Sequence, residues 1–425
     1  MRIDRRVMIF FMALLATFAA SADDYCPSDS VAVELSDEAL RENPEFDDQT
    51  LTGVDSDIDL SAYPFLHNDA NHIMLNGADW SSLMLSLDES LNQPVSIVHL
   101  GDSHIQADML SGHTRRLLRQ RYGDYGRGLI VPLRLAGTNQ PVDYCFSSDS
   151  RFTVDRLLSY PWSEAMGFTG IALTPQTDDF SFTVSAGAMF ERIVVYYTGS
   201  ALSAKSVTGD GASLVFTTTD SPGCLEIALP FPCGEATLTL SALGPVSIFG
   251  VSLYSDAVGL AYNAIGINGA TCASYNRVAE LGSGIALLAP DLIIVSLGTN
   301  EAFGRFDPAD FSAELDRLVT SIRNENPGVH LLLTTPAECY RRIRRRRRRS
   351  YVVNDRIAHV RQAILDYGRD NAIAVYDWYV AAGGAGSAAK WLSSGLLGRD
   401  RVHCTRTGYQ VAGQMLYDAL IQLQK

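Results

Sequence analysis

Three features are scarce in this chain: long apolar runs, closely spaced cysteines and positive charge. After residue 22, no stretch of the 425 residues is long and apolar enough to span a bilayer, so we expect no integral membrane span there. None of the seven cysteines stands in a C-x-x-C pair, which gives no indication of a zinc site. The formal net charge of −14 disfavours nucleic acids and anionic membranes as general partners.

The first 22 residues have the three parts of a secretory signal. Three arginines come first, an apolar run covers residues 7–20, and Ala20-Ser21-Ala22 forms an A-x-A cleavage site. We therefore expect residues 1–22 to be removed and the mature protein to be exported, either to a periplasm or out of the cell. The alternative is that this segment stays attached as a single N-terminal anchor helix.

Export would permit disulfides, although the number of cysteines is odd. Cys224 and Cys233 flank a predicted hairpin and are the best candidate pair. Free buried thiols are an equally good interpretation of the same residues.

Hydrophobic periodicity divides the rest of the chain into four parts. Residues 23–77 are an acidic N-terminal segment that begins as a solvated leader. Residues 78–142 and 257–425 alternate strands with helices, which is the pattern of an α/β domain with a doubly wound parallel sheet. Residues 143–256 consist of short alternating runs separated by Gly, Ser, Asp and Pro, which is typical of a β-sandwich. We therefore predict a β-sandwich inserted into an α/β domain.

The α/β parts predict a definite order of elements. The expected strands are residues 95–100, 291–297, 329–335 and 372–376, the expected helices are 78–91, 110–122, 308–324, 352–367 and 405–423, and residues 123–138 are predicted to be loop. Active sites in such sheets lie at the carboxyl ends of the strands. Ser103 and the segment after Leu297 both fall at such ends.

Ser103 is the candidate nucleophile, because Gly101-Asp102-Ser103-His104-Ile105-Gln106 connects a predicted strand to a predicted helix. A serine on such a turn has backbone N–H groups beside its hydroxyl, where an oxyanion can form. Near the C-terminus, Asp400 stands three residues before His403. His403 is the candidate general base, and Asp400 would orient its imidazole and stabilise the imidazolium. Together they predict a hydrolytic triad in the chain order Ser, Asp, His.

Two further segments can supply hydrogen-bond donors for the oxyanion. Gly269 in Ile267-Asn268-Gly269-Ala270 would let a backbone N–H approach closely, although the nearby Gly266 keeps a purely structural turn open. Asn300 in Gly298-Thr299-Asn300-Glu301 follows a predicted strand and could donate its side-chain amide. With the N–H of Ser103, these groups form the predicted oxyanion hole.

These four blocks, in this order, resemble the SGNH hydrolases, also called the GDSL esterase family. The match is specific as a set and covers about residues 78–140 and 257–425. It implies a flavodoxin-like SGNH fold and a serine esterase that needs no cofactor and no metal. The family's block residues correspond to Ser103, Gly269, Asn300, Asp400 and His403.

Three features narrow this resemblance further: the GDSHIQ form of the serine block, the segment Gly123-Asp-Tyr-Gly-Arg-Gly128 and the β-rich insert. In these features the chain resembles periplasmic peptidoglycan O-acetylesterases, whose insert is similar to a carbohydrate-binding module. This resemblance implies removal of acetyl groups from muramic acid hydroxyls, with acetylated polysaccharide or peptidoglycan as the partner. An acetylesterase for another polysaccharide, an SGNH-type lipase or acyltransferase, and a non-catalytic glycan-binding protein remain the alternatives.

Three further features attract attention. His104 and Trp391 are candidates for lining the substrate site, although Trp391 could equally be a core tryptophan. His99, His104 and His113 lie near the nucleophile but lack a ligand spacing, so we predict no metal site. The run from Arg341 to Arg349 holds eight arginines, and we predict a solvated surface loop there, or one that attracts an anionic polymer.

Overall fold

The computed structural model describes residues 58–163, 165–345 and 348–424. The predicted signal segment 1–22 and most of the acidic segment 23–77 lie outside these residues. Among the residues described, no helix combines the length and the apolar character that crossing a membrane requires.

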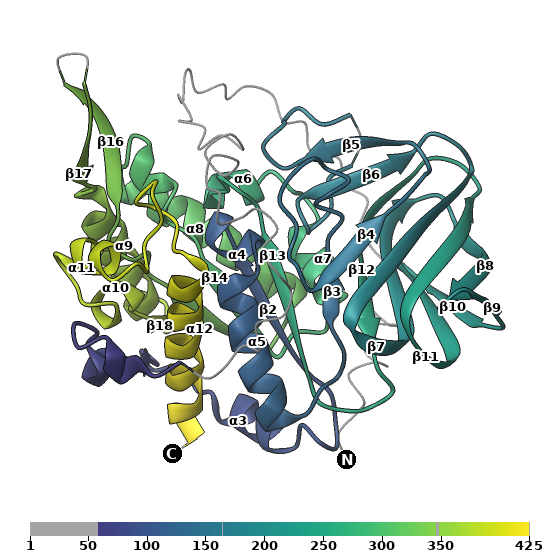
Figure 1. Cartoon of the computed structure of the whole chain (residues 1–425), viewed down its shortest axis with the longest axis horizontal. Helices are drawn as coiled ribbons and strands as arrows, with labels where there is room; N and C mark the ends of the chain where they lie inside the picture. Colours follow the sequence, from purple (N-terminus) through teal and green to yellow (C-terminus); the bar gives the residue numbers. More distant parts are fainter. Residues whose placement is uncertain (1–57, 164, 346–347, 425) are drawn as a thin grey trace. The chain divides into compact units, whose positions relative to one another are not determined.

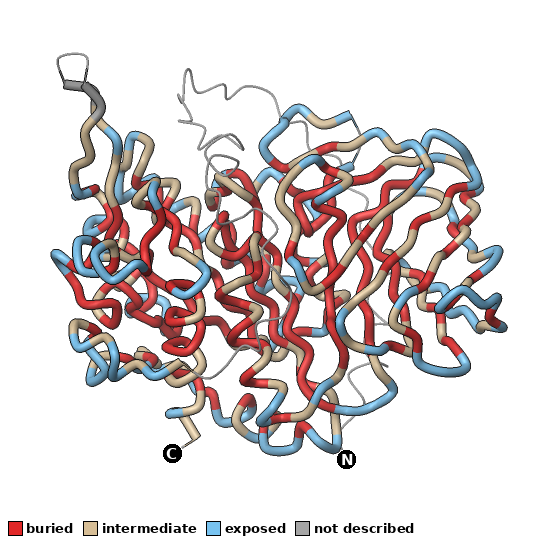
Figure 2. Tube along the Cα trace, in the orientation of Figure 1, coloured by how far each residue is buried: buried red, intermediate tan, exposed pale blue. Residues whose placement is uncertain are grey.

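Five parallel strands form the α/β sheet (Figure 1). In sheet order they are β18 (Ala374–Tyr376), β15 (His330–Thr334), β14 (Leu292–Ser296), β2 (Val95–Gly101) and β13 (Leu260–Gly266). A sixth strand, β1 (Ile73–Met74), pairs antiparallel with β18 at one edge, so part of the acidic segment belongs to this sheet. The central strands are buried along nearly their whole length, as expected for parallel strands covered on both faces (Figure 2).

Helices cover the two faces of this sheet in two sets. Successive residues of β2 point to opposite faces, so Ile97 enters the core with α5 (Met109–Tyr122) and α12 (Arg406–Ile421). Val98 enters the other core, with α8 (Pro308–Glu325) and α9 (Arg356–Asp370). This arrangement confirms the predicted doubly wound α/β class. The other helices are α3 (Ser81–Asp88), α4 (Ser103–Gln106), α6 (Cys272–Tyr275), α7 (Leu281–Ala286), α10 (Trp378–Ala381), α11 (Ser387–Ser393), η3 (Leu60–Ala62), η4 (Asn68–Ala70), η5 (Glu301–Phe303) and η6 (Gln422–Gln424).

Local sequence signals set where the longer helices begin. Asp307 accepts hydrogen bonds from the N–H groups of Ala309 and Asp310, and a proline occupies the first turn of α8. Thr405 accepts from the N–H of Gly408 at the start of α12. The N-cap of α12 therefore lies two residues after His403, which fixes the loop that carries this residue.

Between α5 and β13 the chain forms a ten-stranded antiparallel sheet. Two long strands change neighbours along their length. The first half of β7 (Asp179–Gly199) pairs with β4 and its second half with β12, while β11 (Cys224–Ala242) pairs with β10 and then with β8. The sheet therefore folds over on itself, and the rings of Phe152 and Phe180 meet with centroids 5.9 Å apart. The other strands are β3 (Gly128–Ile130), β4 (Tyr144–Ser147), β5 (Phe152–Arg156), β6 (Ile171–Pro175), β8 (Leu202–Gly209), β9 (Ala212–Leu214), β10 (Thr217–Ser221) and β12 (Val246–Tyr254).

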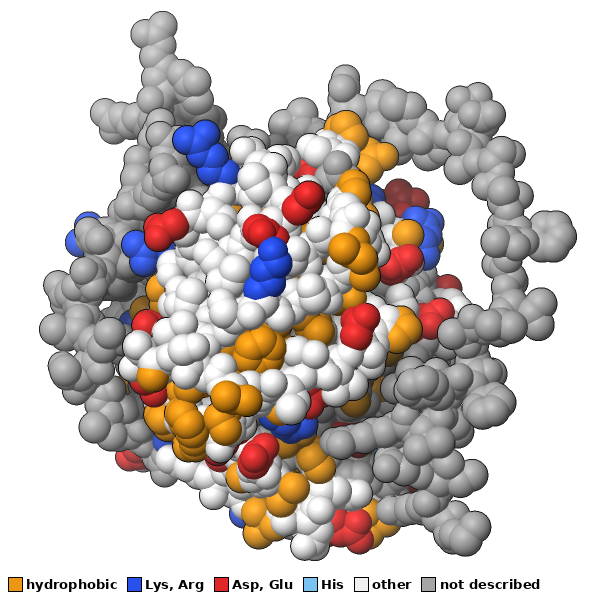
Figure 3. Space-filling view, turned by 90° about the vertical axis from the view of Figure 1, so that its right-hand side faces the viewer, with side chains coloured by type: hydrophobic (Ala, Val, Ile, Leu, Met, Phe, Trp, Pro, Cys, Tyr) orange, Lys and Arg blue, Asp and Glu red, His pale blue; other side chains and the backbone are white. Residues whose placement is uncertain are grey.

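This folded antiparallel sheet agrees with the predicted inserted β-sandwich. Its outer side, at the right of Figure 1, carries hydrophobic side chains with acidic and basic side chains between them (Figure 3). Exposed large hydrophobic residues of the insert include Val215, Phe231 and Leu243. Hydrophobic side chains that are exposed singly are normal on a protein surface.

Two predictions of local structure are wrong. Residues 128–130, predicted to be loop, form β3 and pair with β12. The arginine run is not a loop but a hairpin of β16 (Tyr340–Arg345) and β17 (Arg348–Val353), so α9 begins at residue 356 rather than 352. Arginine gives little strand signal. The hairpin starts and ends with aromatic and β-branched residues, which favour strands.

The six described cysteines are free. Cys224 and Cys233 lie on the same strand, β11, nine residues apart. A strand rises about 3.3 Å per residue, whereas bonded cysteines have Cα atoms roughly 5.5–6 Å apart. The interpretation as free thiols is therefore the correct one for this pair.

Candidate active site

Ser103, His403 and Asp400 form one line of hydrogen-bonding groups. Ser103 is the first residue of α4, and only Asp102 separates it from the end of β2. Its Oγ lies 2.8 Å from Nε2 of His403, and Nδ1 of His403 lies 2.6 Å from Oδ2 of Asp400. Ser103 and His403 are both buried, at 6% and 1% exposure. A hydroxyl beside an imidazole that a carboxylate orients is the arrangement that activates an alcohol as a nucleophile.

The loop that carries Asp400 and His403 is held by its own backbone. Oδ1 of Asp400 accepts hydrogen bonds from the N–H groups of Val402 and His403, at 2.9 and 3.0 Å. Burial alone would raise the pKa of Asp400, but the hydrogen bond and charge of His403 and these N–H groups lower it overall. The carboxylate therefore stays ionised and available to the imidazole.

Arg401 connects this loop to the arginine hairpin. It has a left-handed backbone, with φ of 62°, and its carbonyl accepts the N–H of Tyr340 at 3.0 Å. Its guanidinium lies 4.3 Å from the ring centroid of Tyr351 and 5.4 Å from that of Tyr340. The base of the hairpin thus supports the loop between the two triad candidates.

The two glycines of the second block have different places. Gly266 ends β13, and a Cβ there would lie 2.2 Å from the backbone nitrogen of Gln106, so only glycine lets β13 pack against the serine turn. Gly269 follows in a turn with φ of +78°, a conformation that favours glycine. Gly266 therefore serves packing, and Gly269 is the glycine whose N–H lies in the turn beyond the strand.

The side chain of Asn300 connects three of the four blocks. Its Nδ2 donates to the carbonyl of Ala270 at 2.9 Å and lies 3.3 Å from Oδ2 of Asp102. The next residue, Glu301, accepts the N–H of Cys272 at 2.9 Å and so fixes the start of α6. The structure thus brings Asn300 to the segments that carry Gly269 and Ser103.

Asp102 and Gln106 also hold the site, and the sequence reasoning assigned them no role. Asp102 is the N-cap of α4 and accepts the N–H of His104 at 2.9 Å; an aspartate before a helix is a signal that could have indicated this. Gln106 accepts the N–H of Asn268 at 2.7 Å and donates to Asn139. Its partners lie 33 and 162 residues away, so no local pattern could have indicated them.

Two buried carboxyl groups next to the site have unusual acidity. Burial raises the pKa of Asp102 to about 7, against the opposing hydrogen bond from His104, and the nearby Glu301 adds to the rise. Burial also raises the pKa of Glu301. The surroundings of Ser103 are thus poor in water and keep the proton on carboxyl groups at higher pH than usual.

His104 packs beside His403. The two imidazole centroids are 5.3 Å apart, and Nδ1 of His104 lies 3.0 Å from the hydroxyl of Tyr409. Burial, followed by the nearby His403, lowers the pKa of His104 to about 3, so this imidazole is neutral. A neutral ring in this place supports the position of His403.

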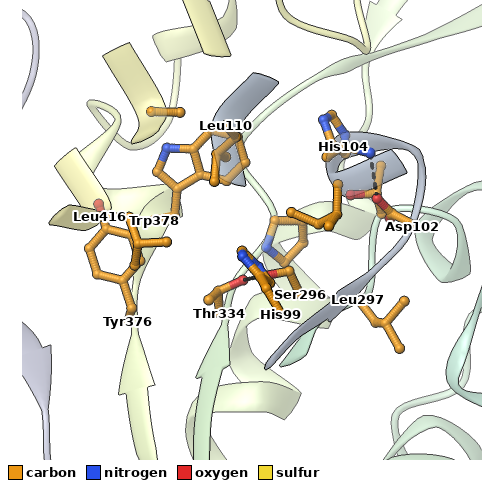
Figure 4. A pocket seen from close by; sticks show the side chains of 14 residues that line it. His99, Asp102, His104, Leu110, Ser296, Leu297, Thr334, Tyr376, Trp378 and Leu416 are labelled. Atoms are coloured by element: carbon orange, nitrogen blue, oxygen red, sulfur yellow. Dashed lines mark hydrogen bonds between the residues drawn. The ribbon is translucent and has the colours of Figure 1, made fainter. Parts of the chain in front are cut away.

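A cavity lies beneath the serine turn (Figure 4). His104 and Asp102 border one side of it, and neither Ser103 nor His403 lines it. Trp391 lines a second cavity that also borders His104. Trp391 is 4% exposed and donates Nε1–H to Ala382 at 2.8 Å, so it is a core tryptophan. The cavity in Figure 4 is lined by His99, Asp102, His104, Ile105, Leu110, Ser296, Leu297, Thr299, Thr334, Pro336, Tyr376, Trp378, Ala412 and Leu416.

The chain matches a family model over part of its length and a solved structure in fold. A model of the GDSL-like lipase/acylhydrolase family matches residues 250–411, which include Gly269, Asn300, Asp400 and His403 but not Ser103. A solved structure of a peptidoglycan O-acetylesterase is 24% identical; the match covers 83% of this chain and 98% of that one, with a TM-score of 0.69.

Weaker structural matches include a lipase/acylhydrolase from Enterococcus faecalis, 20% identical over 39% of this chain and 77% of that one, with a TM-score of 0.30. Another is a family two carbohydrate esterase from Clostridium thermocellum, 11% identical over 66% and 99%, with a TM-score of 0.29. No curated protein matches the chain. Residues 250–411 thus resemble the GDSL-like lipase/acylhydrolase family, and the chain shares its fold with the peptidoglycan O-acetylesterase.

Proposed function

We propose that this hydrolase removes O-acetyl groups from a cell-wall glycan, with peptidoglycan as the substrate, through an acyl-serine intermediate. The observation that carries the chemistry is the line from Ser103 through His403 to Asp400, with separations of 2.8 and 2.6 Å. Ser103 attacks the acetyl carbonyl while its proton passes to Nε2 of His403. Asp400 holds Nδ1 of the imidazole and stabilises the imidazolium that forms.

The second half of the reaction uses the same groups. His403 gives its proton to the sugar oxygen, which leaves as a hydroxyl. A water molecule then attacks the acyl-serine while His403 takes its proton, and acetate is released with Ser103 restored. No cofactor takes part in this scheme.

Three donors face the oxyanion of each tetrahedral intermediate: the N–H groups of Ser103 and Gly269 and the amide of Asn300. In the free enzyme the amide is 2.9 Å from the carbonyl of Ala270 and 3.3 Å from Asp102. The oxyanion replaces the longer contact, because the shorter one keeps the amide in its orientation. One such donor typically contributes about 3 kcal/mol to transition-state stabilisation.

Two observations favour a polymeric glycan over a lipid. The solved structure that shares this fold at a TM-score of 0.69 is a peptidoglycan O-acetylesterase. In addition, neither of the two cavities bordering His104 is lined by Ser103, so neither is a tunnel that could take a long acyl chain from the nucleophile. An exported enzyme, as the first 22 residues predict, would meet such a glycan.

The test is acetate release from O-acetylated peptidoglycan by the wild type and by Ser103→Ala. The variant should lose activity by a factor on the order of 10³ or more, while its free energy of unfolding changes by less than about 1 kcal/mol. Ser283→Ala, at an exposed serine of α7, is the matched control and should keep full activity. Equal acetate release by Ser103→Ala and the wild type would contradict the assignment of Ser103 as the nucleophile. Acetate release from p-nitrophenyl acetate but not from peptidoglycan would contradict peptidoglycan as the substrate.

A further inference from the structure

One turn of the insert lies over the oxyanion glycine. A Cβ placed on Gly269 would come 3.0 Å from Cδ1 of Leu158, which belongs to the turn between β5 and β6. Leu158 is 47% exposed although it is a leucine. The turn therefore presents an apolar side chain to solvent at the edge of the site, where a substrate on Ser103 would continue outward.

The same turn carries two aromatic residues. Tyr160 is 59% exposed, and its ring meets that of Trp162 edge to face, with centroids 5.3 Å apart and planes at 89°. Trp162 donates Nε1–H to the carbonyl of Arg156 at 3.0 Å, and the N–H of Ser163 donates to the carboxylate of Asp155. These bonds tie Trp162 and Ser163 back to β5, next to the exposed ring of Tyr160.

A cation from the hydrolase part completes the group. The guanidinium of Arg277, an exposed residue just after α6, lies 5.4 Å from the ring centroid of Tyr160. Leu158 and Tyr160 come from the insert, whereas Arg277 comes from the segment that begins with Gly269. The two parts of the chain thus share one exposed ledge of an apolar residue, two aromatic rings and one positive charge.

We propose that this ledge, Leu158, Tyr160, Trp162 and Arg277, binds the sugar next to the acetylated one in an anionic glycan. Sugar rings present apolar C–H faces that suit exposed aromatic and aliphatic side chains, and Arg277 pairs with a carboxylate on the glycan or on its substituents. The inference rests on the proposed function, and it narrows the substrate class to glycans that carry carboxylates, as peptidoglycan does through its peptides.

The experiment compares two substrates for each variant of the full chain. We measure kcat/KM for O-acetylated peptidoglycan and divide it by kcat/KM for p-nitrophenyl acetate, which is too small to reach the ledge from Ser103. Tyr160→Ala should lower this ratio roughly tenfold, and Arg277→Gln about threefold, with the Arg277 effect vanishing at high salt. Phe231→Ala, at an aromatic residue of β11 that is 52% exposed, is the matched control and should leave the ratio unchanged.

The outcomes separate the ledge from the proposed function. If Tyr160→Ala has the same ratio as Phe231→Ala, the ledge does not bind substrate. If Arg277→Gln loses as much on neutral acetylated xylan as on peptidoglycan, the preference for an anionic glycan is wrong. If the wild type releases no acetate from peptidoglycan, the proposed function fails. Pelleting of Ser103→Ala with insoluble peptidoglycan, with and without Tyr160→Ala, then tests the ledge by binding alone, and equal pelleting overturns it.

Discussion

The parallel sheet and the inserted β-sandwich bury different kinds of side chain. In the sheet, His99 of β2 is fully buried, with its ring nitrogens 2.7 Å from the hydroxyl of Tyr262 and 2.6 Å from that of Ser296. Asp102, Ser103 and His403 are buried at its carboxyl edge. Among the described residues of the insert, by contrast, the core is apolar, and its buried polar side chains are Asp155, Thr169, Ser247 and Ser252.

This difference indicates that the sheet carries the catalytic groups, whereas the insert core mainly contributes stability. A buried polar group costs free energy unless it is hydrogen-bonded, so the sheet keeps such groups only with partners already in place. The same preorganised groups can act on a substrate without rearranging. The insert gains its stability from apolar burial and leaves polar and aromatic groups for its surface. Substitutions in the sheet should therefore reduce activity more than stability, and those in the insert core the reverse.

Among the substitutions at the edge of the sheet, Asp400→Asn should have the largest effect on activity. The amide has nearly the shape of the carboxylate but cannot stabilise an imidazolium, and it favours the wrong tautomer of His403. We expect kcat for p-nitrophenyl acetate to fall by a factor on the order of 10³–10⁴, with the free energy of unfolding almost unchanged. Steady-state kinetics and urea unfolding of the same sample measure both. A kcat within tenfold of the wild type would contradict the role of Asp400.

Phe182→Ala should do the opposite in the insert. Phe182 is 1% exposed and stacks on Phe146 with ring centroids 4.8 Å apart. Removing a buried phenylalanine typically lowers the free energy of unfolding by about 3–5 kcal/mol. Urea unfolding should show this loss, while kcat for p-nitrophenyl acetate below the transition stays near that of the wild type. If kcat falls together with stability, the insert core is coupled to the chemistry and the comparison fails.

The sequence predicts the fold better than it predicts the support of the site. Alternating strands and helices predict the doubly wound sheet, because buried parallel strands are continuous apolar runs such as Leu292–Ser296. The sequence analysis does not predict the strand Leu260–Gly266, which runs directly into the glycine-containing turn at Gly269. Gln106 joins segments far apart in the chain, and the arginine hairpin pairs residues that give little strand signal. Contacts of this kind leave no periodic pattern in the sequence, so the sequence does not predict them.

Asp102→Asn should change how the free energy of unfolding depends on pH. Burial raises the pKa of Asp102 from 3.8 to about 7, so between these values the folded state binds a proton that the unfolded state has lost. The free energy of unfolding contributed by this group is thus fully present below pH 3.8 and is lost as the pH rises through 7. The variant lacks this titration, so its stability relative to the wild type should rise by on the order of 1 kcal/mol per pH unit between those limits. Urea unfolding across this range measures the difference; a constant difference would contradict the raised pKa.

The smallest effect concerns the arginines of the hairpin. Tyr340 and Tyr351 hold Arg401 at its base, so these residues are kept, and Arg344–Arg349 are replaced with serine. A cluster of positive charge in a chain of net charge −14 should attract the carboxylates of peptidoglycan over a distance of about 10 Å at 0.1 M salt. We expect binding to insoluble peptidoglycan to weaken several-fold at low ionic strength and to match the wild type near 1 M salt, where the Debye length is about 3 Å.

Replacing the same six residues with lysine provides the matched control for the serine variant of the hairpin. Lysine keeps the charge and loses the planar guanidinium, so this variant should bind peptidoglycan nearly as well as the wild type if attraction at a distance is the cause. Binding as weak as that of the serine variant would instead indicate specific arginine contacts. Unchanged binding by the serine variant at low salt would leave the hairpin with a single function, the support of the loop between Asp400 and His403.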